Sequence, residues 1–213
     1  MRVCVGCVLR GRLDAIPECG ERTTSLGVGI RWLPVEHDGD RTESVQEADA
    51  IAREIEHVLA GTLTDAKGTR ALRPSDVMVV APYNAQVRLL TERLPKGVEI
   101  GTVDKFQGRE APVVFYSMTT SSGEDVPHGL EFLFSRHRLN VAISRAQCLA
   151  HLVCSPRLLE VNCRTIEQMR LANALCRFAD LAASPELSIT PPSPSAAPPA
   201  PARSPAAPRV AGS

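Results

Sequence analysis

Val77-Met-Val-Val-Ala81 decides the fold, because Pro82 follows it directly and an amphipathic segment, 84–94, comes next. A short apolar run rich in β-branched residues predicts a strand that is buried on both faces. Proline ends such a strand because it has no amide hydrogen to donate, and the apolar spacing of 84–94 predicts a helix. A buried strand followed at once by a helix is the repeating unit of a parallel sheet.

The same alternation extends to both sides of this stretch. A helix is predicted over 44–61, where Ser44 and Glu47 form a capping-box pattern and Gly61 ends the helix. The other predicted strands are 30–35, 98–101, 113–119 and 149–154, and the other predicted helices are 136–147 and 165–181. The sequence therefore predicts an α/β domain with a parallel sheet and helices on both faces. Functional residues are expected in loops after the strands, at 82–86, 102–110 and 120–127.

Composition divides the chain into three parts. We predict one folded domain over 30–182, preceded by a linking segment, 1–29, and followed by a tail, 183–213. The stretch 184–213 holds nine of the seventeen prolines, with much alanine and serine, so it is predicted to be disordered. No apolar run approaches the roughly 20 residues that cross a bilayer, and a cytoplasmic protein without a membrane partner is expected.

Charge and cysteine content limit the function classes. The 24 basic and 24 acidic residues cancel, so any nucleic-acid binding must depend on a local surface. Cys4, Cys7 and Cys19 lie close together, but the second close pair that a structural zinc site needs does not follow. We therefore predict thiols and no metal site, and bound zinc in the purified protein would reverse that interpretation.

Two segments hold candidate functional residues. Thr102-Val-Asp-Lys-Phe-Gln-Gly-Arg-Glu110 places polar side chains between two apolar strands, and Gly108 permits close backbone approach. This pattern is typical of a ligand-contact loop, although a solvated turn has it too. Arg138 and Arg145 are seven residues apart and share a helical face. They are interpreted either as phosphate ligands or as surface arginines in weak salt bridges.

Three motifs carry a family resemblance. Gly101-Thr-Val-Asp-Lys-Phe-Gln-Gly-Arg-Glu110 resembles motif V of superfamily 1 helicases of the Upf-like branch. Leu139-Asn-Val-Ala-Ile-Ser-Arg-Ala146 resembles motif VI, and Ala81-Pro-Tyr-Asn-Ala-Gln86 resembles the Pro-Tyr-x-x-Gln motif that precedes both. The motifs follow the order of the family across 30–176. The stretch 121–156 is also similar to bacterial proteins in which such a motor follows a RecB-like nuclease domain.

The resemblance implies a RecA-like, P-loop-NTPase-type fold and two groups of site residues. In the nucleotide group, Glu110 holds the ribose hydroxyls, Gln107 and Gly108 lie near the γ-phosphate, and Arg145 is the catalytic arginine finger. In the second group, Thr102, Tyr83 and Asn84 contact the backbone or bases of a single strand of nucleic acid, DNA being favoured over RNA. From the residues alone, Thr102 is equally well placed to cap a turn and Tyr83 to pack.

Two parts of a complete motor are missing from the sequence. It has no Gly-x-x-x-x-Gly-Lys-Ser/Thr loop for phosphates and no Asp-Glu pair after a strand for magnesium. The resemblance therefore implies that ATP and Mg²⁺ bind only with a first RecA-like motor domain, in cis or in trans. We expect this chain alone to be inactive as an ATPase and leave open whether Met1 is the true start. The alternatives are a non-catalytic module that binds nucleic acid or protein and a gene product without activity.

Overall fold

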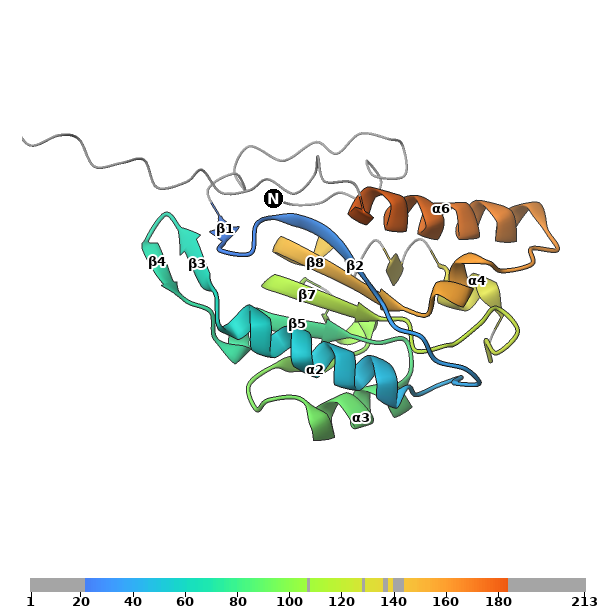
Figure 1. The fold of residues 1–213 in the computed structure, drawn as a ribbon, viewed down its shortest axis with the longest axis horizontal. Helices are drawn as coiled ribbons and strands as arrows, with labels where there is room; N and C mark the ends of the chain where they lie inside the picture. Colours follow the sequence, from blue (N-terminus) through green and yellow to red (C-terminus); the bar gives the residue numbers. More distant parts are fainter. Residues whose placement is uncertain (1–21, 107, 128, 136–137, 140–143, 184–213) are drawn as a thin grey trace, which may run out of the picture.

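The computed structural model describes residues 22–106, 108–127, 129–135, 138–139 and 144–183 (Figure 1). Several parts of the sequence named above lie outside these ranges: Met1, Cys4, Cys7, Cys19, Gln107, the motif VI residues 140–143 and the tail 184–213. The zinc alternative, the role of Gln107 and the disorder of the tail therefore stay predictions.

A five-stranded parallel sheet forms the centre of the domain. Its strands, in spatial order, are β2 (Gly29–Pro34), β8 (Ala146–Cys154), β7 (Ala111–Ser117), β5 (Val77–Val80) and β6 (Glu99–Gly101). All four neighbouring pairs are parallel. The α/β, RecA-like fold predicted from the sequence is confirmed.

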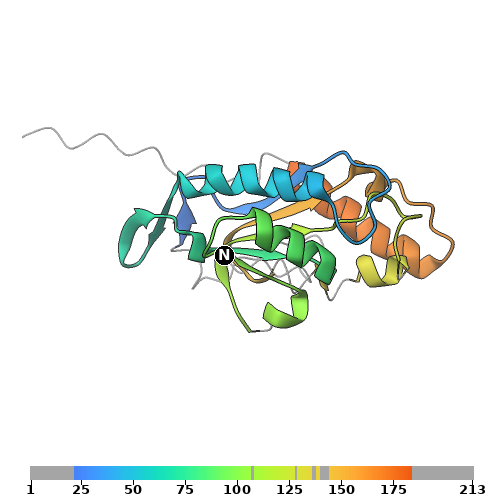
Figure 2. The ribbon, with the colours of Figure 1, turned by 90° about the horizontal axis from the view of Figure 1, so that it is seen from below.

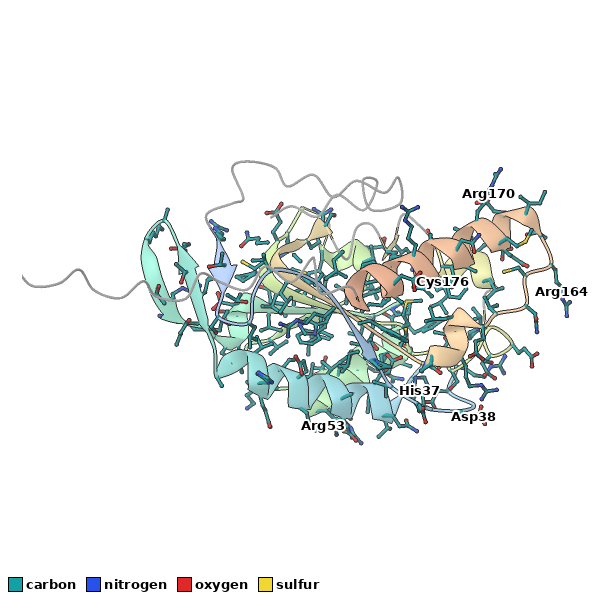
Figure 3. The ribbon with its side chains drawn as sticks, turned by 45° about the horizontal axis from the view of Figure 1, so that its top comes forward. His37, Asp38, Arg53, Arg164, Arg170 and Cys176 are labelled. Carbon is teal, nitrogen blue, oxygen red and sulfur yellow. The ribbon has the colours of Figure 1, made fainter. Side chains whose placement is uncertain are left out.

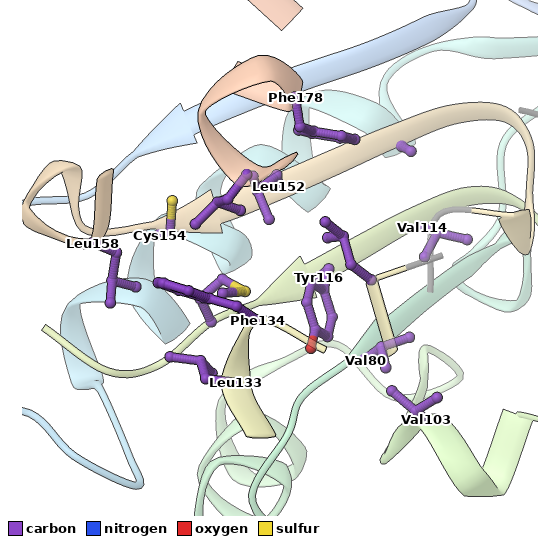
Figure 4. Packing of buried hydrophobic residues seen from close by; sticks show 14 of the residues in the cluster. Val80, Val103, Val114, Tyr116, Leu133, Phe134, Leu152, Cys154, Leu158 and Phe178 are labelled. Atoms are coloured by element: carbon purple, nitrogen blue, oxygen red, sulfur yellow. The ribbon is translucent and has the colours of Figure 1, made fainter. Parts of the chain in front are cut away.

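Helices cover both faces of this sheet (Figures 1 and 2). On one face lie α2 (Val45–Leu59) and α3 (Asn84–Arg93), and on the other lie α4 (Leu130–Leu133) and α6 (Ile166–Ala183). Strand β5 shows why both faces are apolar: Val77 and Val79 pack in the cluster under α2 and α3, whereas Met78 and Val80 pack in the opposite cluster (Figure 4). Burial on both faces is the reason that the strand lacks polar alternation.

A second, three-stranded antiparallel sheet was not predicted. It consists of β1 (Thr23–Thr24), β3 (Thr62–Asp65) and β4 (Gly68–Ala71), in the order β1-β3-β4. Its hairpin is fixed to the start of β5 through the 3₁₀ helix η2 (Pro74–Asp76). Both guanidinium amines of Arg70 donate to the Asp76 carboxylate, at 2.6 and 2.7 Å, and this ion pair lowers the pKa of Asp76.

The predicted helices and strands agree with the structure except at two places. Ser44 caps α2 as predicted, accepting from the Glu47 amide at 3.2 Å, but Val45, whose spacing from the other apolar residues indicates the buried face, is 43% exposed. The predicted helix 136–147 extends too far, because β8 already begins at Ala146. The Ala111 amide donates to the Arg145 carbonyl at 3.0 Å. This bond starts the pairing of β7 with β8, so Ala146 and Gln147 belong to a strand, while 136–137 and 140–143 of the predicted helix lie outside the described residues.

Candidate functional site

The predicted site residues lie at two opposite edges of the parallel sheet. Tyr83 and Asn84 follow β5 and Thr102 follows β6, so these three lie at carboxyl ends of strands. Glu110 and Arg145 instead come directly before β7 and β8, at amino ends. The loop 102–110 is a crossover between two parallel strands and must return to the opposite edge before the next strand starts. The loop 102–110, expected at a carboxyl end, therefore begins there with Thr102 but ends at an amino end with Glu110.

Glu110 and Arg145 form a pair of neighbours at the amino edge. The residues that follow them, Ala111 and Ala146, are register partners in β7 and β8. Glu110 is exposed and accepts from the Gln147 side-chain amide at 3.5 Å. Arg145 is half-buried, and its buried Nε has no hydrogen-bond partner within the described part of the chain. A guanidinium with an unused donor beside an exposed carboxylate is chemically suited to a ligand that has both phosphate and hydroxyl groups.

The crossover loop is anchored before it reaches this pair. Its 3₁₀ helix, η3 (Val103–Phe106), buries Val103 and Phe106 in the apolar core. Gly101 lets η3 pack closely, because a Cβ there would lie 2.4 Å from Lys105 Cδ and 3.2 Å from the Phe106 ring. Gly108 has a φ of +82°, a conformation that L side chains rarely adopt. Both glycines of the motif thus have a steric role in setting the path of the loop.

The three carboxyl-edge residues differ in how far solvent reaches them. Asn84 is exposed as the first residue of α3, and Thr102 is half-buried, with its carbonyl accepting from the Lys105 amide at 3.1 Å. Tyr83 is only 6% exposed, and its ring stacks on Phe132 with the ring centroids 5.7 Å apart. The Arg138 guanidinium lies 4.1 Å from the centroid of the Phe132 ring, a cation–π contact that neither sequence interpretation of Arg138 foresaw.

A buried polar network that sequence reasoning missed lies behind the carboxyl edge. At its centre is the carboxylate of Glu47, which is fully buried on α2. One oxygen accepts from the Ser117 hydroxyl at 2.5 Å and from the Thr119 amide at 2.9 Å, and the other lies 3.2 Å from Nε2 of His37. His37 reaches the network from the loop after β2, near the start of α2 (Figure 3). Burial raises the pKa of Glu47, and these hydrogen bonds offset part of that rise.

Gln86 joins α2 and α3 to the same network. Its side-chain oxygen accepts from the Ser44 amide at 2.7 Å, and its nitrogen donates to the Ser44 carbonyl at 3.2 Å and to the Ser117 hydroxyl at 3.1 Å. Gln86 therefore caps the Ser44 amide, which the capping-box prediction had given to the Glu47 carboxylate. The half of the capping box that depends on Ser44 is confirmed, and the half that depends on the Glu47 carboxylate is wrong.

Thr119 is the strained residue of this region. Its φ is +73°, the one positive φ of a non-glycine residue within the described chain. A β-branched residue in this conformation costs about 1–3 kcal/mol, so the surrounding structure must hold it there. The Glu47 carboxylate supplies such a restraint through the Thr119 amide.

Within the described residues, no group of three or more His, Cys, Asp or Glu side chains is arranged to hold a metal ion. In the same ranges, no helix has the length and apolar character needed to cross a membrane.

Comparison with known proteins places the domain. Residues 21–157 match the family described as "AAA domain". The chain belongs to this family. The match covers β2, β5, β6, β7 and β8, and with them both edges of the sheet described above.

The relatives of this AAA domain include several helicases. It is 47% identical over 77 residues to the DNA polymerase alpha-associated DNA helicase A of Schizosaccharomyces pombe, covering 35% of this chain and 11% of the relative. It is 39% identical over 95 residues to the human DNA replication ATP-dependent helicase/nuclease DNA2, covering 40% and 9%. With a putative helicase of Danio rerio, mov-10-B.1, the identity is 31% over 135 residues, covering 56% and 13%.

The matched regions amount to about a tenth of the length of these relatives. The resemblance to superfamily 1 helicases is confirmed.

Proposed function

We propose that this AAA domain, which we assign to 30–182, is the second motor domain of an ATP-dependent helicase that acts on a single strand of DNA. The observation that carries the proposal is the juxtaposition of Glu110 and the half-buried Arg145, which directly precede neighbouring strands. A first RecA-like motor domain, in cis or in trans, provides the phosphate loop and the magnesium ligands. The names of the relatives favour DNA over RNA and are compatible with a linked nuclease domain.

The donor set of the amino edge fits part of an ATP molecule. The Glu110 carboxylate accepts hydrogen bonds from ribose hydroxyls, and the Arg145 guanidinium neutralises charge on the transferring phosphoryl group. Gly108 brings the loop backbone to this edge, and Gln107 belongs to the same loop. Magnesium would be held by the first domain and would supply positive charge, so that Arg145 would have less phosphate charge to stabilise.

The carboxyl edge is the proposed nucleic-acid surface. Asn84 and Thr102 follow neighbouring strands, because the Ala81 amide donates to the Gly101 carbonyl at 3.1 Å. Their amide and hydroxyl groups are suited to phosphate oxygens or base edges. The ring face of Tyr83 is covered by Phe132 and its hydroxyl is buried, so Tyr83 supports this surface by packing beside Asn84.

ATP hydrolysis tests whether the chain is half of a motor. We expect the purified chain to show no hydrolysis, and we expect hydrolysis stimulated by single-stranded DNA once a first motor domain is supplied. An arginine finger stabilises a transition state that the other domain must assemble. Hydrolysis by the chain alone that Arg145→Ala abolishes would contradict the proposal. The intact mass of the native product shows whether that first domain is part of the same polypeptide.

Single-strand binding tests the carboxyl edge. We expect Asn84→Ala and Thr102→Ala each to weaken binding of a labelled oligothymidine about fivefold, the effect of losing one hydrogen bond of about 1 kcal/mol. Fluorescence anisotropy measures the affinity. Thr69→Ala is the matched control. Thr69 is an exposed threonine of the β3–β4 hairpin, which leads into the amino end of β5 and not to the carboxyl edge. Equal affinities for all variants would place the DNA contact elsewhere, and binding of proteins but not DNA would favour the non-catalytic module.

A further inference from the structure

Thr119 and Thr120 follow β7 at the carboxyl edge, the proposed DNA surface. Both are buried, and Thr119 has the left-handed backbone conformation described above. Thr120 donates to the Arg41 carbonyl at 2.9 Å, and its side chain also interacts with the Tyr83 hydroxyl. The conformation of Thr119 thus determines where Thr120 lies, and Thr120 is one of the groups that surround Tyr83.

Glu47 helps to hold this conformation, together with the backbone bond from the Thr120 amide to the Met118 carbonyl, at 2.8 Å across the turn. Its Oε2 atom is the acceptor for the Thr119 amide and for the hydroxyl of Ser117, two residues earlier in the chain. His37 lies against the other oxygen, and Nδ1 of the same ring lies 2.8 Å from the Ser121 hydroxyl. The carboxylate therefore restrains the segment 117–121 directly at Ser117 and Thr119 and, through His37, at Ser121.

The same network also restrains the start of α3, the helix that begins at Asn84 directly after Tyr83. Gln86 lies two residues after Asn84 in the first turn of α3, and its side chain donates to the Ser117 hydroxyl that also contacts Glu47. Helix α3 begins at Asn84, so its start is tied to β7 through Gln86 and Ser117. Two buried side chains, from α2 and α3, thus converge on one hydroxyl behind the proposed DNA surface.

We propose that Glu47 is a positioning residue for nucleic-acid binding, which holds Thr119 in its left-handed conformation and thereby fixes Tyr83 and Asn84 at the carboxyl edge. This inference rests on the proposed function. Glu47 does not touch the nucleic acid and acts only through the segment 117–121.

Stability alone does not account for a carboxylate at this position. A fully buried carboxylate loses its hydration, and apolar residues of similar volume often replace buried charged groups without loss of stability. Nor does Glu47 cap its own helix, since Gln86 occupies the Ser44 amide. What an apolar residue cannot supply is an acceptor for the Thr119 amide, and that is the function assigned here.

The test compares the DNA affinities of three variants. The probe is a labelled oligothymidine of about 20 nucleotides, which is longer than the stretch that one single-strand-binding domain usually covers. Glu47→Leu removes the acceptor, and we expect it to weaken binding about tenfold, which corresponds to about 1.4 kcal/mol. Glu47→Gln retains an acceptor oxygen, and its affinity should stay within about threefold of the wild type. Glu47→Leu combined with Thr119→Gly should recover most of the loss, because glycine adopts a positive φ without a restraint.

The control separates positioning from loss of stability. Ser44→Ala removes the cap of the same helix and leaves the backbone bonds between Ser44 and Gln86 in place. It should lower the urea midpoint without changing DNA affinity. A Glu47→Leu variant that binds as tightly as the wild type would overturn the inference, and so would a glycine at 119 that restores nothing.

Amide hydrogen exchange of the wild type tests the inference without depending on whether any variant folds. The Thr119 amide should exchange as slowly as the amides of β7, because it is buried and bonded to Glu47. Exchange as fast as that of an exposed loop would overturn the inference. A wild-type chain that binds no DNA at all would instead show that the proposed function is wrong.

Discussion

In a motor completed by a first RecA-like domain, Arg145→Ala is expected to lower the kcat for ATP hydrolysis about a thousandfold. The Michaelis constant for ATP should change little, because an arginine finger acts on charge that develops in the transition state. The structure gives a specific reason to choose this arginine: it directly precedes β8, next to Glu110 at the start of β7. Steady-state kinetics with saturating single-stranded DNA measures both constants.

Two variants show whether the effect belongs to the guanidinium. Arg145→Lys keeps the positive charge but loses the planar pair of donors, so it should recover only a small part of kcat. Arg170→Ala is the matched control, since Arg170 is an exposed arginine of α6 in a weak i,i+3 contact with Glu167. A thousandfold loss confined to the Michaelis constant, or a similar loss in Arg170→Ala, would remove Arg145 from the role of the finger.

Glu110→Gln separates the two residues of the amino edge. A carboxylate that holds ribose hydroxyls binds substrate and transition state alike, so this change should raise the Michaelis constant and leave kcat nearly unaltered. Because Glu110 and Arg145 are neighbours at the amino edge, opposite kinetic signatures from the two variants would show that they contact different parts of one nucleotide.

The sheet was predictable because its strands are apolar on both faces. Val77 to Val80 have no polar residue to interrupt the strand pattern, and the two core clusters take alternate residues from this strand. The composition of this strand alone therefore indicates that it is buried on both faces. The β3–β4 hairpin was missed because its strands are short, polar and exposed, with few apolar residues to show a period. In retrospect Thr62, Thr64 and Thr69 indicate extended structure, and the hydroxyls of Thr64 and Thr69 lie 2.8 Å apart across the hairpin.

The role of Glu47 was beyond sequence reasoning for a different reason. Local spacing correctly identified Ser44 as a helix cap and therefore gave Glu47 the reciprocal bond. The actual partner of the Ser44 amide, Gln86, is 42 residues away in the chain, and Thr119 is 72 residues from Glu47. Such partners become neighbours only when the strands are ordered in the sheet, and a pattern of spacings within one helix does not contain that order.

The position of the loop 102–110 in the sheet is the remaining difference between the predicted and the observed site. The sequence pattern correctly identified 102–110 as a loop between two strands, and its residues were expected at one edge. Strands β6 and β7 both run parallel to β5, so this loop must return from the carboxyl end of β6 to the amino end of β7. The first residue of the loop, Thr102, and the last, Glu110, therefore lie at opposite edges, and each serves a different ligand in the function proposed above.

A second large effect is expected in acid, where His151 should destabilise the fold. His151 is buried on β8 and stacks on Phe115, with the ring centroids 4.4 Å apart. Burial, with smaller contributions from the positive charges of Arg31 and His57, lowers its pKa to about 3. Nε2 of this ring has no hydrogen-bond partner in the described residues, and Nδ1 lies 4.0 Å from the Glu54 carboxylate.

The sign follows from the number of protons bound in each state. The unfolded chain protonates this imidazole near its ordinary pKa of about 6.5, whereas the folded chain keeps it neutral down to about 3. Its contribution is therefore fully present above about pH 6.5 and is lost progressively as the pH falls toward 3. Between pH 7 and about pH 5, the loss in the free energy of unfolding should be about 2 kcal/mol.

Urea unfolding of wild type and His151→Leu at both pH values isolates this contribution. Leucine cannot be protonated, so the variant should gain about 2 kcal/mol relative to the wild type when the pH falls from 7 to about 5. Glu47 acts in the opposite direction, because its raised pKa favours the folded state as it becomes protonated, but it is present in both proteins and cancels in the difference. A difference between wild type and His151→Leu that does not change with pH would mean that the buried ring accepts a proton without unfolding, and that the site opens locally around β8.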